Sequence, residues 1–599
     1  MQRVIRSQRR LQSPARLFSS SRGSYQVIVR GRPQDEMPEL LDPNHKLGHM
    51  SRFIMKDFLT SERRDLEAIV CGHSKASLSF GDLHRQSYSL ASNLKKHFGT
   101  KQGDVVAVMS PNNINYFACL IGIPLTGAAS TPINPLYTKE EMLHQLNLTD
   151  AKVVVAHPAC MAVAQAAAAE KGIPILNIDS AHGNVDGVAG LADFLMESED
   201  SLDYDSFAGA AGDKSFDEFK SLVTIPFSSG TTGLAKGVML NHRNVIANVL
   251  QIQPSEGKYL LKEHTRSGER GSLLCPLPFF HIYGLVAGLL VPTFAGAKTV
   301  FMSQFDLPLF LQIIQDHKIT RGHVVPPIAL ALAKHPMIDE YDLSSLEGLM
   351  SGAAPLGGEI QLQASKRLNC IVKQAWGMTE LSPAGSLTPD DVLRPNGFAD
   401  EDWIKNVDTI IGKSGYLTPA TEGKIIHPES GEDLESTETG ELLLRGPQVM
   451  MGYLKNKEAT DNTITPDGWL KTGDIGHFTE DGWLLITDRN KELIKYKGFQ
   501  VPPAELEALL LTMEELSDAV VIPVEDDEVG ELPRAYVVKN EAVLQGKDLT
   551  EQEVLDYVAE RVAPHKKLRG GVRFTESVPK SASGKILRRV QKQIDRGEI

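Results

Sequence analysis

Residues 228–237 read Ser-Ser-Gly-Thr-Thr-Gly-Leu-Ala-Lys-Gly and directly follow the apolar run 222–227, Leu-Val-Thr-Ile-Pro-Phe. Four hydroxyl side chains and three glycines in these ten residues leave the backbone N–H groups unshielded, so a phosphate can approach them closely. Lys236 adds a compact cation for the charge that develops on a leaving pyrophosphate. Because the apolar run is typical of a buried strand, the stretch predicts a strand that leads into a phosphate-binding loop.

Two other interpretations of this loop are possible. A Walker A loop carries Ser or Thr directly after its lysine, whereas here Ala235 precedes Lys236 and Gly237 follows it, so that class is excluded. The second alternative is a flexible linker rich in glycine, serine and threonine. The apolar run ahead of the loop favours phosphate binding over a linker.

The bulk composition is that of a globular protein. The chain has 599 residues, 42% of them hydrophobic and 23% charged, which is long enough for two or more domains. A net charge of −14 argues against nucleic acid as a partner. Five scattered cysteines without a close C-x-x-C pair indicate reduced thiols rather than disulfides or a zinc site. Apolar stretches such as 284–297 are too short to span a bilayer, so we expect no integral membrane contact.

The N-terminal segment differs from this average. The first acidic residue of the chain is Asp35, and three serines occupy positions 19–21. Six arginines lie in the same segment: Arg3, Arg6, Arg9, Arg10, Arg16 and Arg22. An arginine-rich, serine-rich and acid-poor segment is the pattern of a mitochondrial transit peptide. We therefore expect residues 1–24 to be a transit peptide and the protein to reside in the mitochondrial matrix. A basic tail that stays attached to a cytoplasmic protein is the alternative.

The remaining chain predicts an α/β fold. Expected strands at 105–109, 153–156 and 175–178 alternate with expected helices at 140–148 and 160–171, which is the rhythm of stacked βαβ units around a mostly parallel sheet. The polar, proline-containing segment 388–408 is predicted to be a surface excursion.

The sequence pattern changes after residue 412 and predicts two further structural units. Short strands at 440–445 and 483–488, separated by glycine turns, fit the hairpins of a β-rich subdomain. From about residue 490, expected helices at 503–512 and 551–562 alternate with expected strands, and this tail is long enough for a small α+β domain. The predicted domains are therefore 45–489 and 490–599.

Six motifs follow the loop in a fixed order. They are 278–284 (Pro-Phe-Phe-His-Ile-Tyr-Gly), 351–356 (Ser-Gly-Ala-Ala-Pro-Leu), 374–380 (Gln-Ala-Trp-Gly-Met-Thr-Glu), 468–474 (Gly-Trp-Leu-Lys-Thr-Gly-Asp), 488–498 (from Asp-Arg to Lys-Tyr-Lys-Gly) and 579–585 (Pro-Lys-Ser-Ala-Ser-Gly-Lys). Each alone is a weak signal, but their order and spacing together are specific. The series resembles the adenylate-forming superfamily of acyl-CoA synthetases, above all the 4-coumarate–CoA ligase group, over nearly the whole chain beyond about residue 45.

The resemblance implies a large N-terminal domain, a small mobile C-terminal lid and two half-reactions. In the first, a carboxylate attacks the α-phosphate of ATP to give an acyl-AMP and pyrophosphate. In the second, the thiol of coenzyme A displaces AMP and forms a thioester. The implied ligands are thus ATP, Mg²⁺, coenzyme A and a small carboxylic acid, while the oligomeric state stays open.

The nucleotide-binding residues follow from the same resemblance. Glu380 would bind the magnesium ion, and Thr232 would act in catalysis near it. Trp376 stands where the superfamily more often has tyrosine, and Ala375 stands where plant members tend to have glycine. The full set implied for ATP and AMP is Ser228, Ser229, Gly230, Thr231, Thr232, Lys236, Gln374, Ala375, Trp376, Thr379, Asp474, Arg489, Lys491, Lys495 and Lys585.

The catalytic and acyl-binding residues are also assigned by resemblance. Lys585 would be the catalytic lysine of adenylation, delivered by the lid, and Lys495 would act in thioester formation. Lys491 would mark the hinge. The residues implied for the acyl group are His281, Tyr283, Gly284, Gly352 and Ala353, and His281 would also act in catalysis. Those implied for coenzyme A are Lys497, Gly498 and Gln500. With no lysine or arginine set to hold a second acid group, the expected substrate is a hydrophobic monocarboxylic acid, medium-chain or aryl.

Two alternatives remain open. One is an adenylating enzyme whose acceptor is not coenzyme A, because Gln304 stands where plant ligases carry a lysine toward the coenzyme A phosphates. The other is a catalytically silent relative that binds nucleotide or lipid. The joint presence of Lys236, Glu380, Asp474 and Lys585 argues against the silent relative.

Overall fold

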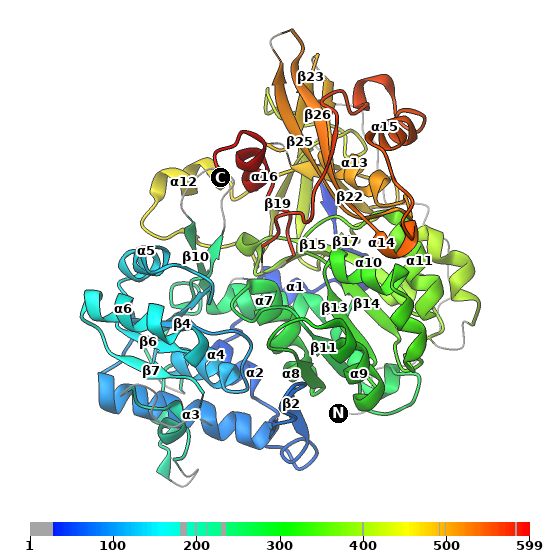
Figure 1. Ribbon diagram of the computed structural model, residues 1–599. Coiled ribbons are helices and arrows are strands. Elements are labelled where there is room, and N and C mark those ends of the chain that lie inside the picture. Colours follow the sequence, from blue (N-terminus) through cyan, green and yellow to red (C-terminus); the bar gives the residue numbers. More distant parts are fainter. Residues whose placement is uncertain are drawn as a thin grey trace, which may run out of the picture.

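The computed structural model describes residues 28–42, 44–179, 188–197, 201–210, 213–228, 235–397, 401–489, 491–497, 499–526, 528–581 and 584–599. Two sheets, made largely of parallel strands, form the body of the molecule, and two further sheets lie toward its C-terminal end (Figure 1). The expected mixed α/β architecture is confirmed. None of the described helices is both long and apolar enough to cross a membrane.

The first body sheet carries the predicted βαβ units. Its strands run in the order β20-β10-β8-β5-β4-β6-β7, with β9 beside β10. Their bounds are β4 Val105–Met109, β5 Ala129–Ile133, β6 Val153–Ala156, β7 Ile175–Asn177, β8 Leu222–Thr224, β9 Phe227–Ser228, β10 Lys236–Asn241 and β20 Gly452–Tyr453. Helices α5 (Lys139–Thr149) and α6 (Met161–Lys171) connect these strands where the sequence predicts helices.

The second body sheet is the larger one. Among the described residues its order is β17-β16-β15-β14-β13-β11-β12-β2-β3, and the strands from β15 to β2 are parallel. The bounds are β2 Glu67–Cys71, β3 Ser77–Ser79, β11 Ser272–Cys275, β12 Lys298–Phe301, β13 Arg321–Val324, β14 Gly348–Ser351, β15 Ile371–Gly377, β16 Ala384–Leu387 and β17 Tyr416–Leu417. Its carboxyl edge, where ligands of open α/β sheets bind, therefore lies at the ends of β14 and β15.

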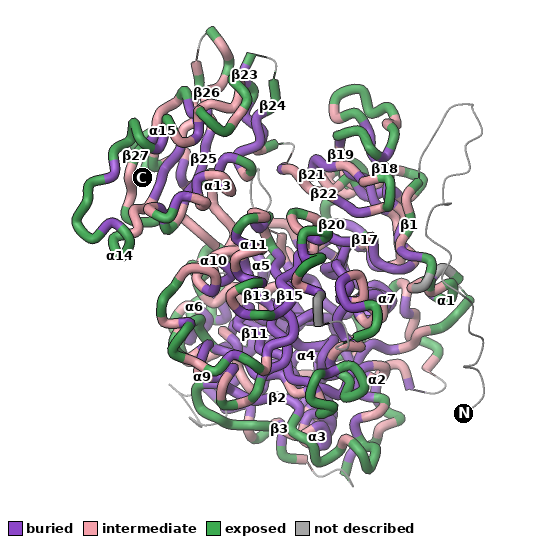
Figure 2. Tube along the Cα trace, turned by 90° about the vertical axis from the view of Figure 1, so that its right-hand side faces the viewer, coloured by how far each residue is buried: buried purple, intermediate pink, exposed green. Residues whose placement is uncertain are grey.

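A shared core joins the two sheets. Helices α4 (Tyr116–Leu125) and α7 (His242–Ile252) lie between them and are buried along almost their whole length. Strand β4 contributes Val106 and Val108 to this core and Val105, Ala107 and Met109 to a second core beneath α5 and α6. This alternation follows from the two-residue period of a strand. In Figure 2 the buried part of the chain runs through α4, β11 and β13.

The β-rich and C-terminal parts follow. The antiparallel sheet β1-β18-β19-β21-β22 contains β1 (Val29–Arg30), β18 (Glu422–Ile426), β19 (Gly440–Arg445), β21 (Leu470–Phe478) and β22 (Leu484–Arg489). The last sheet contains β23 (Ile494–Tyr496), β24 (Phe499–Val501), β25 (Leu516–Asp526), β26 (Gly530–Lys539) and β27 (Val572–Phe574). Around it pack α13 (Pro503–Leu510), α15 (Glu551–Ala559) and α16 (Arg588–Asp595). The change of sheet falls between Arg489 and Ile494, next to the predicted domain boundary.

The prediction that segment 388–408 is a surface excursion is wrong for part of it, because residues 395–397 are exposed whereas other described residues are buried. Asp390, Leu393, Trp403 and Val407 are each no more than 5% exposed, and the last three belong to a small hydrophobic cluster with Trp483. Asp390, one of the polar residues that suggested an exposed loop, is buried because it has charged partners inside the protein, described below. The segment is therefore part of the support of the second body sheet.

Candidate active site

A cavity of about 590 Å³ opens at the carboxyl edge of the second body sheet. Residues from both body sheets, from the β-rich sheet and from the C-terminal part line it together. The predicted site residues on its wall are Ser228, Lys236, His281, Tyr283, Gly352, Ala353, Ala375, Trp376, Thr379, Glu380, Arg489, Lys491 and Lys585. A smaller cavity of about 220 Å³ adjoins it, shares Trp376, Arg489 and Lys585, and adds Asp474.

Asp474 and its two partners form the nucleotide end of the site. Strand β21 places Asp474 opposite Arg489 on β22, and Arg489 Nε lies 3.4 Å from Asp474 Oδ1. The indole Nε1–H of Trp376, at the end of β15, donates to Asp474 Oδ2 at 3.0 Å. Tryptophan in place of the more usual tyrosine therefore keeps a flat stacking face and fixes the carboxylate as well.

The electrostatics of Asp474 suit an acceptor of hydroxyl groups. Burial raises its pKa, while Arg489 and the Trp376 indole act in the opposite direction. A buried carboxylate held by two donors keeps a fixed orientation and retains further lone pairs. The arrangement can accept hydrogen bonds from a ribose.

The structure describes only the two ends of the predicted phosphate-binding loop, residues 228–237. Ser228 on β9 and Lys236 on β10 are cross-strand neighbours, so the loop between them is closed by a hairpin. The predicted residues Ser229, Gly230, Thr231 and Thr232 lie outside the described residues. The apolar run ahead of the loop forms two short strands, β8 and β9, rather than one, because Pro226 has no backbone N–H for the ladder.

Tyr453 links the predicted phosphate cation to the predicted metal ligand. Lys236 Nζ lies 4.8 Å from the centre of the Tyr453 ring, and Tyr453 Oη–H donates to Glu380 Oε1 at 2.8 Å. Glu380 is 5% exposed yet borders the cavity. A single carboxylate beside a phosphate loop fits Mg²⁺, which takes one or two carboxylates and completes its shell with phosphate oxygens and water.

Lys585 enters the cavity from the C-terminal part. Its backbone N–H donates to Ser581 Oγ at 3.1 Å, and the preceding Gly584 has φ +77°. A Cβ at Gly584 would also lie 2.8 Å from Val325 Cγ2, so only glycine fits this turn. Burial, together with the charge of Arg489, lowers the pKa of Lys585 to about 8.

This pKa predicts a pH dependence of the first half-reaction. The ammonium form of Lys585 is present below about pH 8 and is lost above it, whereas free lysine keeps its charge to higher pH. We expect kcat/KM for ATP–pyrophosphate exchange to decline above about pH 8 because this parameter reports groups of the free enzyme. A Lys585→Arg variant stays charged throughout and is expected to lose the decline. A wild-type profile that stays flat to pH 9.5 would contradict the assignment.

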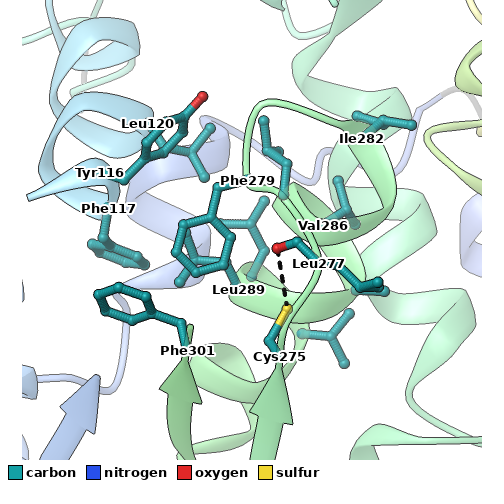
Figure 3. Close-up of a cluster of buried hydrophobic side chains, with 14 of the residues drawn as sticks. Tyr116, Phe117, Leu120, Cys275, Leu277, Phe279, Ile282, Val286, Leu289 and Phe301 are labelled. Atoms are coloured by element: carbon teal, nitrogen blue, oxygen red, sulfur yellow. Dashed lines mark hydrogen bonds between the residues drawn. The ribbon is translucent and has the colours of Figure 1, made fainter. Parts of the chain in front are cut away.

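His281 and Tyr283 form the wall next to Lys585. Burial, helped by Lys585, lowers the pKa of His281 to about 4, so its imidazole is neutral. The Tyr283 backbone N–H donates to His281 Nδ1 at 3.4 Å, and Tyr283 Oη–H donates to the Met350 carbonyl at 3.3 Å. Behind them, Phe279 packs against Tyr116 and Phe301 and anchors the loop in the core (Figure 3).

The small residues of this wall have different roles. A Cβ at Gly352 would lie 3.0 Å from the Tyr283 ring, so Gly352 leaves room for the tyrosine at the cavity. Ala353 borders the cavity with φ +73°. Gly284 was predicted to contact the acyl group, but it lies behind the wall. A Cβ there would stand 2.3 Å from the Pro278 carbonyl oxygen, so close backbone packing explains this glycine.

Gln374 has a supporting position. Its side-chain Oε1 accepts from the Leu356 backbone N–H at 3.0 Å, and its Nε2 donates to the Leu356 carbonyl and to Gln361 Oε1. The amide therefore fixes the loop that follows β14. Its predicted contact with the nucleotide stays a prediction.

The residues predicted for thioester formation lie apart from the cavity. Lys495, Lys497 and Gln500 are exposed on and beside β23 and β24, and none of them lines either cavity. Gly498 lies outside the described residues, while Lys491 reaches the cavity wall. In this arrangement the C-terminal part presents Lys585 to the cavity, which is the lysine predicted for adenylation.

Glu256 on the cavity wall belongs to a group of buried charges that the sequence analysis did not find. Arg321 and Lys373 each pair with both Glu256 and Asp390 at 2.5–2.9 Å, and all four side chains are buried. Burial pushes the pKa of Glu256 up, but Arg321 and Lys373 outweigh it and lower the pKa. This charge quartet ties segment 388–408 to β13 and β15.

Known proteins resemble the chain along nearly its whole length. A family model described as AMP-binding enzyme matches residues 59–454, and one described as AMP-binding enzyme C-terminal domain matches residues 505–585. 4-coumarate–CoA ligase 2 of Nicotiana tabacum is 38% identical over 564 residues, which cover 93% of this chain and 96% of the relative. 4-coumarate–CoA ligase 1 of Petroselinum crispum is 37% identical over 558 residues, covering 93% and 95%.

Solved structures share the fold. ATP-bound MatB from Rhodopseudomonas palustris has a TM-score of 0.76 at 24% identity, covering 90% of this chain and 98% of that one. The anthranilate CoA ligase AuaEII in complex with anthranoyl-AMP has a TM-score of 0.77 at 20% identity, covering 92% and 98%. The resemblance inferred from the motifs is thus confirmed by sequence and fold together: this chain belongs to the AMP-binding enzyme family, and the two plant relatives named above are 4-coumarate–CoA ligases.

Proposed function

We propose that the protein is an ATP-dependent acid–CoA ligase that forms an acyl-AMP and then an acyl-CoA thioester. The observation that carries the proposal is the meeting of Lys585 with the pair Asp474 and Arg489 at two adjoining cavities, both of which Lys585 and Arg489 line. A ribose site next to a buried ammonium group places the α-phosphate within reach of that cation. Relatives named 4-coumarate–CoA ligase at 37–38% identity support coenzyme A as the acceptor.

In the proposed first step, an oxygen of the substrate carboxylate attacks the α-phosphorus of ATP. A new P–O bond forms to the acid, the bond to the β-phosphate oxygen breaks, and pyrophosphate leaves. Lys236 and the loop of residues 228–237 would hold the leaving group, and Glu380 would hold Mg²⁺, whose charge would offset that of the phosphates. Lys585 bridges the attacking carboxylate and the α-phosphate.

In the proposed second step, the thiol of coenzyme A attacks the acyl carbonyl and AMP leaves. Lys495, Lys497, Gly498 and Gln500 would act after the C-terminal part has turned about Lys491 and brought them to the cavity. Neutral His281 stands beside the path of the carboxylate and thiol. The substrate proposed is a hydrophobic monocarboxylic acid, aryl or medium-chain, because apolar residues such as Ile252, Ala287 and Leu387 line the cavity.

A pyrophosphate-release screen tests this proposal. Purified protein is given ATP, Mg²⁺ and a panel of short- to long-chain fatty acids and aryl acids, with and without coenzyme A. We expect sustained turnover and a thioester product only with coenzyme A. Adenylate that accumulates regardless of coenzyme A would support a different acceptor, and the absence of pyrophosphate with every acid would support a silent relative.

We also propose that the protein is imported into mitochondria. The support is the arginine- and serine-rich composition of residues 1–24. Fusing residues 1–30 to a fluorescent reporter is expected to direct the reporter to the mitochondrial matrix, and changing the arginines at 3, 6, 9 and 10 to glutamine is expected to leave it in the cytoplasm. A reporter that stays cytoplasmic with the intact segment would overturn this proposal.

A further inference from the structure

Helix α10 (Pro326–Lys334), which joins β13 to β14, touches the C-terminal part at both of its ends. At its start, Val325 lies against Gly584, where an added Cβ would stand 2.8 Å from Val325 Cγ2. Gly584 directly precedes Lys585. At its other end, Lys334 reaches two carbonyl groups that follow α13. One helix of the body therefore contacts both the turn that carries Lys585 and a helix of the C-terminal part.

Helix α13 is held at both ends by side chains from outside the C-terminal part. In its first turn, the Ala504 backbone N–H donates to Asp488 Oδ2 on β22 at 3.0 Å. Past its last turn, Lys334 Nζ donates to the carbonyl of Leu511 at 2.7 Å and to that of Met513 at 3.3 Å. A carboxylate at the start and an ammonium group at the end both match the partial charges of a helix. The position of α13 is thus fixed at two points.

Helix α13 is in turn tied to the turn of Lys585. Arg588 follows Lys585 by three residues, and its Nε donates to Glu507 Oε1 on α13 at 3.0 Å. The other guanidinium nitrogens of Arg588 donate to Glu507 Oε2 and to Glu492. Glu507 is held as well by the Val521 backbone N–H at 2.9 Å. A displacement of α13 would therefore carry Lys585 with it.

From these contacts we infer that Lys334 is a positioning residue of the first half-reaction, which acts by holding α13, and through it Lys585, in the arrangement that presents Lys585 to the cavity. Lys334 lines neither cavity, so it acts through α13 and not on the substrates. The inference rests on the proposed function, because the second half-reaction requires this contact to break. Lys334 is only half-buried, and a contact at such a site can bias an equilibrium and still be released.

Lys334→Met tests the inference through the two half-reactions of the full-length protein. ATP–pyrophosphate exchange with an acid that is turned over is expected to slow by on the order of tenfold, because the hydrogen bonds of a charged group are lost. Thioester formation from supplied acyl-AMP and coenzyme A is expected to stay at the wild-type rate or to rise. Lys334→Arg keeps the charge and the donors and is expected to restore most of the exchange.

Two further variants complete this set. Lys334→Gln removes the charge with a polar side chain and is expected to separate the half-reactions in the same way, so it replaces Lys334→Met if that variant fails to fold. Lys366→Met is the matched control. Lys366 is exposed in the last turn of the neighbouring helix α11 (Gly358–Leu368), and its loss is expected to leave both half-reactions unchanged.

A crosslink measures the position of α13 without any turnover. A Cβ at Gly357 would lie 3.2 Å from Ala508 Cβ on α13, close to the separation that a disulfide spans, and the five native cysteines are buried. The double variant Gly357→Cys/Ala508→Cys is expected to crosslink on mild oxidation. Adding Lys334→Met is expected to slow crosslinking several-fold. The oxidised double variant is expected to keep exchange and to lose thioester formation, compared with its own reduced form.

The outcomes separate this inference from the proposed function. Exchange and crosslinking at wild-type rates in Lys334→Met would overturn the role of Lys334 but leave the ligase activity standing. An equal fall of both half-reactions would also overturn it, because a general loss of structure does not distinguish them. If no acid of the panel released pyrophosphate, the proposed function would fail, and the crosslinking rate alone would still show whether Lys334 holds α13.

Discussion

Replacing Lys585 with methionine is expected to slow acyl-adenylate formation by roughly 100-fold to 1,000-fold, the usual cost of removing one preorganised group that stabilises charge in the transition state. Methionine keeps the length and apolar stem of the side chain but removes the ammonium group that is buried beside Arg489 and Asp474. ATP–pyrophosphate exchange in the presence of a turned-over acid measures this step. Thioester formation from supplied acyl-AMP and coenzyme A is expected to change little.

Lys580→Met is the matched control for this variant. Lys580 lies five positions earlier on the same segment and pairs with Asp518 at 2.5 Å within the C-terminal part. It lines the smaller cavity but not the larger one, and its ammonium group is held by Asp518, so its loss is expected to slow exchange far less than the loss of Lys585. If Lys585→Met kept most of the exchange activity, or if both half-reactions fell equally, Lys585 would not be the catalytic lysine of adenylation.

Asp474→Asn is expected to lower kcat/KM for ATP by roughly 100-fold, since each hydrogen bond to a buried charged group is worth about 1.5–3 kcal/mol. Asparagine has the same shape but offers one acceptor oxygen instead of two, and it leaves Arg489 without its anion. The effect is expected mainly in the KM for ATP, because ribose contacts are made equally in the ground state and the transition state. Titration of ATP in the exchange assay measures it.

A smaller change at the same place serves as the control. Trp376→Phe keeps an aromatic face for adenine but removes the Nε1–H that donates to Asp474 at 3.0 Å, and it is expected to cost about tenfold. Thermal unfolding checks that each variant is folded. A KM for ATP within twofold of the wild type in Asp474→Asn would remove Asp474 from the ribose site.

Local patterns predicted much of the fold. The β-branched runs Val105–Met109 and Val153–Ala156 are strands β4 and β6 with the predicted bounds, because each is buried on both faces and carries its signal in its own residues. Segment 388–408 failed for the opposite reason. The polarity of Asp390 looks like exposure in the sequence, and its partners Arg321 and Lys373 are remote along the chain.

The site residues also divide into those that local sequence predicts and those that depend on remote partners. Asp474 and Arg489 could be predicted because their motifs are specific, and they meet across β21 and β22. Tyr453 was missed because its role depends on the pairing of β20 with β10, which brings it between Lys236 and Glu380. His323 on β13 was missed because a histidine in the short strand Arg-Gly-His-Val has no distinctive pattern. Only the structure shows that it borders the larger cavity.

The buried quartet of Glu256, Asp390, Arg321 and Lys373 also constrains how this protein can evolve. Replacing one member alone leaves a buried charge unpaired, at a cost of about 3–5 kcal/mol, which is a large share of the stability of a typical domain. Viable descendants must therefore exchange an anion and a cation together. Apolar positions on the cavity wall, such as Ala287 and Leu387, face no such restriction and tolerate swaps of similar volume. New acid preferences are thus expected to arise from substitutions at these apolar wall positions, while the four charged residues are inherited unchanged.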